Sequence, residues 1–76
     1  MRRLVECLAR GLVDSPEQVE VLETAKAGTL ACDIRVAPGD VGKVIGRQGR
    51  VVTALRTVAN AVAAAHGHRA YVEIDG

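Results

Sequence analysis

Apolar residues change their spacing several times along this chain, and each spacing predicts a different element. Residues 19–24 and 30–37 alternate with a period of two, which predicts two strands joined by a hairpin loop at 25–28. Residues 2–13 have helical spacing instead, and Pro16 ends that pattern because the residue before a proline avoids the helical region. The apolar positions of this predicted helix are Leu4, Val5, Leu8 and Leu12.

The second half of the chain predicts two helices and a closing strand. Pro38 and Gly39 end the strand at 30–37, and Asp40 is placed to cap a short helix at 41–45 by accepting from its first amides. Residues 50–65 form the longest helical pattern, and residues 69–74 alternate again as a strand. We expect the core-facing stripe of helix 50–65 to consist of Val51, Leu55, Val58 and Val62.

The element order α-β-β-α-α-β predicts an α+β domain with two layers. A right-handed crossover from strand 30–37 to strand 69–74 makes those two strands parallel. The fold expected is a three-stranded mixed sheet with helices on one face, and residues 1–76 are expected to form a single domain.

The composition narrows the possible functions. The net charge is only +1, so a nucleic-acid site has to be a local basic patch. Cys7 and Cys32 are too few for a disulfide framework, and no run is long and apolar enough for a signal sequence or a membrane span, so we expect a cytoplasmic protein. Neither a catalytic constellation nor a metal or cofactor site is predicted, since His66 and His68 have no third ligand nearby in the sequence.

One short segment carries the candidate chemistry. Gly46 and Gly49 enclose Arg47 and Gln48 just before the long helix. A Gly-x-x-Gly turn lets another backbone approach its amides, and the helix N-terminus beside it favours an anion. The pair of glycines alone is a weak signal, but the cluster of Lys43, Arg47 and Arg50 around it indicates a sugar-phosphate backbone. The P-loop is excluded because Gly42-Lys43 is followed by valine.

The element order, with Val44-Ile45-Gly46-Arg47-Gln48-Gly49 at the junction of two helices, resembles a type II KH domain. The segment from Arg35 to Lys43 and the chain length resemble the small bacterial single-KH proteins of the KhpA (YlqC) family. The resemblance implies an RNA-binding protein and RNA chaperone that acts as a dimer. It also implies a larger partner with Jag, KH and R3H domains, and a role in cell elongation and division.

The resemblance also implies roles for individual residues. Gly46, Arg47, Gln48 and Gly49 would hold the backbone of single-stranded RNA. Ile45 and Val36 would line the base groove, and Lys43 and Arg50 would flank it. Tyr71, the single aromatic residue, is expected to be remote from this groove rather than to stack on bases.

Two classes of function stay open from the sequence. The first is an RNA-binding module, and the second is a protein-interaction module that uses the fold for dimerisation or partner recruitment. Small residues on one flank of helix 50–65 predict a homodimer contact, because they let a second helix approach closely. That predicted contact consists of Ala54, Thr57, Ala61 and Ala65. The competing interpretation is that helix 2–13 of the same chain covers this flank.

Overall fold

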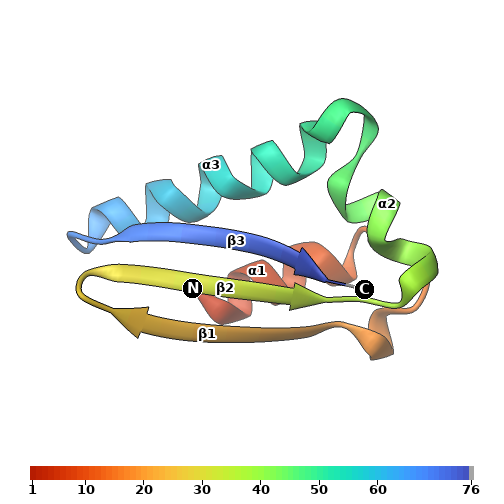
Figure 1. The fold of residues 1–76 in the computed structure, drawn as a ribbon, viewed down its shortest axis with the longest axis horizontal. Helices are drawn as coiled ribbons and strands as arrows, with labels where there is room; N and C mark the ends of the chain where they lie inside the picture. The colour runs from red at the N-terminus through yellow and green to blue at the C-terminus, as the bar shows by residue number, and fades with distance from the viewer. Residues whose placement is uncertain (76) are drawn as a thin grey trace.

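A three-stranded mixed sheet carries the helices on one face in the computed structural model, which describes residues 1–75 (Figure 1). The strands are β1 (Glu20–Lys26), β2 (Thr29–Arg35) and β3 (Arg69–Asp75), in the spatial order β1-β2-β3. β1 pairs with β2 antiparallel, and β2 pairs with β3 parallel. The predicted mixed sheet and its parallel crossover are confirmed.

Three helices connect and cover these strands. They are α1 (Arg2–Arg10), α2 (Val41–Ile45) and α3 (Arg50–Ala65), and short 3₁₀ turns lie at Pro16–Gln18, Pro38–Asp40 and Arg47–Gly49. α1 packs against β1 and β2, whereas α3 packs against β3. The two parallel strands end beside α2, and the chain then turns back into α3 (Figure 1). The predicted order α-β-β-α-α-β is confirmed.

The hairpin between β1 and β2 is tighter than the sequence suggested. Only Ala27 and Gly28 form the turn, with φ of 50° and 81°, because Lys26 already pairs with Thr29. Positive φ at both central residues is the geometry that suits the twist of a two-residue hairpin.

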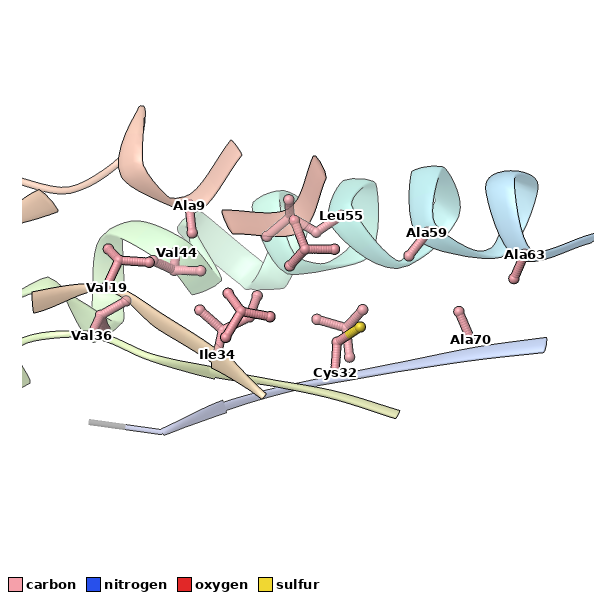
Figure 2. Close-up of a cluster of buried hydrophobic side chains, with 13 residues drawn as sticks. Ala9, Val19, Cys32, Ile34, Val36, Val44, Leu55, Ala59, Ala63 and Ala70 are labelled. Atoms are coloured by element: carbon pink, nitrogen blue, oxygen red, sulfur yellow. The ribbon is translucent and has the colours of Figure 1, made fainter. Parts of the chain in front are cut away.

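The core is aliphatic and fills the space between the sheet and the helices. Ile34 and Cys32 of β2 lie at its centre, both 1 % exposed or less, and they point toward the helical layer (Figure 2). From α1 the buried residues are Val5 and Ala9, while Leu4, Leu8 and Leu12 are each between 36 % and 38 % exposed. The helix ends at Arg10, so the predicted helix 2–13 is too long.

The predicted core stripe of α3 is only partly right, because Leu55 is buried and Val51 is partly buried against the core, whereas Val58 is exposed. The buried positions of this helix are Val52, Leu55, Ala59 and Ala63, and Val58 is 41 % exposed. Ala59 and Ala63 face the sheet, and Ala70 of β3 lies opposite (Figure 2). Small side chains on both layers let the helix approach the sheet closely, so the bulky valines that dominated the sequence pattern lie to the side.

Candidate nucleic-acid interface

The two glycines of the Gly46–Gly49 loop reverse the chain between α2 and α3. The Gly46 amide donates to the carbonyl of Gly42 over 2.8 Å, which closes the last turn of α2. Gly46 then adopts φ 77° and ψ 170°, and the Gly49 amide donates back to the Gly46 carbonyl over 3.1 Å. The result is a short, defined turn at the start of the 16-residue α3.

Packing requires glycine at position 46. A Cβ atom there would lie 2.4 Å from Cγ2 of Val51, in the first turn of α3. Gly49 has more space, with the nearest atom 3.9 Å away, but its φ of 72° is rarely adopted by residues that carry a side chain. Gln48 does adopt a left-handed conformation, with φ 56°. The loop is therefore held in a conformation that the chain alone does not favour.

The electrostatics at the loop suit an anion. The side chains of Arg47, Gln48 and Arg50 are exposed, and the first turn of α3 carries no acidic residue. The N-cap residue is Gly49, which has no side-chain oxygen to satisfy the first amides of the helix. Two guanidinium groups and the positive end of a long helix dipole thus meet at one exposed turn.

Lys43, the third predicted basic residue, already has partners. Its ammonium donates to Oδ2 of Asp14 over 2.6 Å and to Oδ1 of Asp40 over 3.4 Å. Hydrogen bonds to Asp14 first and Asp40 second raise the pKa of the Lys43 ammonium. Lys43 does lie beside the loop, but it reaches a phosphate only by leaving an ion pair.

Asp40 does not play the predicted role of a cap for α2. Its buried carboxylate instead accepts from the amides of Asp14 over 3.3 Å and Ser15 over 3.1 Å. Burial raises the pKa of the Asp40 carboxyl, but hydrogen bonds from these two amides and from Lys43 outweigh it, and the pKa lies below its ordinary value. Asp40 therefore ties the segment after α1 to the start of α2.

The two predicted groove residues lie in different environments. Ile45 is 37 % exposed and immediately precedes Gly46, so its side chain is accessible beside the loop. Val36 is 5 % exposed and belongs to the core, where it offers almost no surface to a base. Of the two predicted groove residues, Ile45 is therefore the accessible one.

A cleft that the sequence did not indicate runs between α3 and β3. It has a volume of about 470 Å³ and is lined by Arg56, Asn60, Ala70, Tyr71, Val72 and Glu73. Nε of Arg56 donates to the Val72 carbonyl over 3.3 Å, and Oδ1 of Asn60 accepts from the Ala70 amide over 3.0 Å. These two side chains hold α3 against the outer edge of β3, which is an edge strand.

The cleft and the loop share one helix. Arg56 follows Arg50 by six positions, which corresponds to about 9 Å along a helix. Tyr71 is 66 % exposed and lines this cleft, opposite the part of α3 that carries Arg56 and Asn60. The sequence feature that could have indicated this cleft is the i, i+4 spacing of Arg56 and Asn60. The same spacing is common on the solvent-exposed face of a helix, so it did not distinguish the two.

The predicted dimer contact is exposed on α3. Ala54, Thr57, Ala61 and Ala65 are all accessible. Of these four, Ala54 also lines an apolar groove of about 220 Å³ between α1 and α3, together with Leu8, Leu12, Val51, Leu55 and Val58. α1 therefore borders this flank of α3 without covering it.

Comparison with known proteins gives one consistent result. The family model described as KhpA/KhpB, KH domain, matches residues 2–74. The RNA-binding protein KhpA of Clostridium acetobutylicum is 45 % identical over 74 residues, which cover 97 % of this chain and 99 % of that protein. The proteins of the same name from Aquifex aeolicus and Chlamydia trachomatis are 40 % and 35 % identical, again over 97 % of this chain and over 94 % and 95 % of their own lengths. Within residues 1–75, no helix is both long and apolar enough to cross a membrane.

Proposed function

The chain belongs to the KhpA/KhpB KH-domain family, and we propose on that premise that residues 1–76 act as one KH domain that binds single-stranded RNA at the Gly46–Gly49 loop. The matched family is not a family of enzymes. The observation that carries the proposal is the loop itself, where a turn requiring glycine, two exposed arginines and the N-terminus of α3 coincide.

In the proposed binding mode, the phosphates and the bases of the RNA contact two different surfaces of the protein. Phosphates approach the amides of the loop and the guanidinium groups of Arg47 and Arg50, where charge attracts them without regard to sequence. Bases turn toward Ile45 and the cleft between α3 and β3. The support for this second part is the position of Arg56 on the helix that begins at the loop, and the exposed ring of Tyr71, which offers a stacking surface.

Ultraviolet crosslinking of the purified protein to single-stranded RNA tests the proposal. We expect crosslinked peptides from residues 45–50 and from residues 70–73, at moderate salt and in competition with unlabelled RNA. An absence of crosslinks under those conditions would favour the second class, a protein-interaction module. The observation that favours this alternative is the exposed apolar groove between α1 and α3.

We also propose that the protein forms a homodimer through α3, with Ala54, Thr57, Ala61 and Ala65 in the contact. Support comes from the exposure of all four residues and from the neighbouring apolar side chains Leu8, Leu12 and Val58, which are 37 %, 38 % and 41 % exposed. A small domain gains stability when a partner covers such surface.

Sedimentation velocity of Ala61→Glu tests the dimer. Ala61 is exposed in the protomer, so the charge should leave the fold intact and produce a monomer. Thr24→Glu places the same charge on the sheet face away from the helices and should leave the dimer unchanged. A dimer of Ala61→Glu as tight as the parent places the contact elsewhere.

The remaining parts of the proposal rest on family membership. We propose that the protein acts in the cytoplasm as an RNA chaperone. We further propose that it pairs with a larger protein containing Jag, KH and R3H domains in the control of cell elongation and division. Two free cysteines within residues 1–75, Cys7 exposed and Cys32 buried, are compatible with a reducing compartment.

A further inference from the structure

Asp14 forms an ion pair with Lys43, the lysine that lies beside the Gly46–Gly49 loop. Lys43 stands in the last turn of α2, three residues before Gly46, and its side chain is 45 % exposed. Oδ2 of Asp14 lies 2.6 Å from its ammonium, and the Asp14 side chain is 78 % exposed. The ion pair is therefore accessible to solvent and to any anion that approaches the loop.

The position of Asp14 does not depend on its own carboxylate. The backbone amides of Asp14 and Ser15 donate to the carboxylate of Asp40, whose side chain is 5 % exposed. This buried tie holds residues 14 and 15 against the start of α2. The side chain of Asp14 adds only the contact to Lys43, so its removal should leave the tie in place.

We propose that Asp14 is an internal competitor of RNA for Lys43, holding the ammonium that would otherwise contact a backbone phosphate beside the Gly46–Gly49 loop. This inference rests on the proposed RNA-binding function and adds a restraint on the affinity of that same site. A carboxylate and a phosphate present the same kind of anionic oxygen to an ammonium. An exposed ion pair is weak, so RNA can displace Asp14 only at the expense of part of the energy gained from the phosphate.

The restraint predicts the effect of removing the Asp14 carboxylate. Asp14→Ala should raise RNA affinity about two- to fivefold at low salt, the range that an exposed ion pair can contribute. The slope of log affinity against log salt should become steeper by about 0.7, the value for one additional phosphate contact on a single strand.

A double-mutant cycle separates competition for Lys43 from a general charge effect. The proteins are the parent, Asp14→Ala, Lys43→Met and the double variant, titrated with a short fluorescent single-stranded RNA of mixed sequence. Glu17→Ala removes the same charge from the neighbouring 3₁₀ turn and serves as the matched control. We expect tighter binding from Asp14→Ala only when Lys43 is present, and no change from Glu17→Ala.

Each other result decides against the inference. An equal gain in the Lys43→Met background would show a general charge effect, and an unchanged affinity of folded Asp14→Ala would show that the pair does not compete. Asp14→Asn, which keeps the shape of the side chain, replaces Asp14→Ala if that variant is unfolded by circular dichroism. If crosslinking and titration of the parent detect no RNA binding, the proposed function fails and this inference fails with it. Binding by the parent without a gain overturns the inference alone.

Discussion

Two turns within residues 1–75 have positive φ at two consecutive residues, Ala27 and Gly28 in one and Gln48 and Gly49 in the other, and their surroundings differ. The hairpin turn at Ala27 and Gly28 is exposed, and a Cβ atom on Gly28 would meet nothing within 4 Å. At the Gly46–Gly49 loop, a Cβ atom on Gly46 would collide with Val51. Both turns have a basic residue nearby, Lys26 in one case and Arg47 in the other. Only the second turn is followed by the N-terminus of a long helix.

The hairpin turn only connects two strands, whereas the conformation of the Gly46–Gly49 loop is fixed by packing and exposes basic side chains. Pairing between β1 and β2 is sufficient to set the hairpin, so its residues can vary within the limits of positive φ. The Gly46–Gly49 loop instead packs against the first turn of α3, and Asp40 connects the start of the preceding helix α2 to residues 14 and 15. We propose RNA binding at this loop because its conformation is fixed although it is exposed and carries cationic side chains.

Replacing each glycine by alanine should give the largest difference between the two turns. Gly46→Ala combines a steric clash with a backbone conformation that is nearly restricted to glycine, and it should lower the free energy of unfolding by about 3 kcal/mol. Gly28→Ala carries only the cost of a left-handed conformation, about 1 kcal/mol. Urea unfolding measures both, and equal losses would contradict the packing argument.

The hydrogen bonds that the Asp40 carboxylate accepts from the amides of Asp14 and Ser15 should make the stability of the fold depend on pH in the acid range. The pKa of Asp40 is lowered in the folded protein, so its contribution is present above the ordinary pKa of a free carboxyl, about 3.9, and is lost as the pH falls through the lower folded value. Asp40→Asn should lower the melting temperature at neutral pH and weaken its decline in acid. Asp33→Asn, on the open face of the sheet, is the matched control. If the melting temperature depended on pH in the same way for the parent and for Asp40→Asn, the ionised Asp40 carboxylate would not stabilise the fold.

The salt dependence of RNA binding should show the smallest effect. With Lys43 held by Asp14, Arg47 and Arg50 can neutralise about two phosphates, which gives a slope of roughly −1.4 on single strands. Arg47→Ala should reduce the slope to roughly −0.7, and Lys26→Ala in the hairpin should leave it unchanged. Titrations at several salt concentrations measure these slopes. An equal change from both variants would mean that binding follows net charge rather than the loop.

The sequence predicted the elements whose pattern is local. The alternation in β2 and β3 and the start of α3 after the glycine pair depend on neighbours within a few residues, and these elements lie within two residues of the expected bounds. The order of elements then restricted the sheet to one topology, because the crossover between parallel strands has a fixed hand.

Apart from the ends of α1 and of the hairpin loop, the features that the sequence did not predict are contacts between distant segments. Lys43 and Asp14 are 29 positions apart, and no local pattern shows that the fold brings them together. Asp40 has the sequence context of a helix cap, but the fold places the amides of Asp14 and Ser15 within reach of its carboxylate. The core stripe of α3 was misplaced because an alanine contributes to a core only when the facing layer approaches closely, as Ala70 allows opposite Ala63.

Charge reversal at the two turns tests the central claim most directly. Arg47 and Gln48 are replaced together by Asp in one variant, and Lys26 and Ala27 in the other, with RNA affinity measured at low salt and folding checked by circular dichroism. Asp tolerates the left-handed conformation of Gln48 and Ala27, so both variants should fold. We predict a loss on the order of tenfold or more for the loop variant and a change of less than about twofold for the hairpin variant. A folded loop variant that binds RNA as tightly as the parent, or an equal loss in both variants, would contradict the assignment of RNA binding to the Gly46–Gly49 loop.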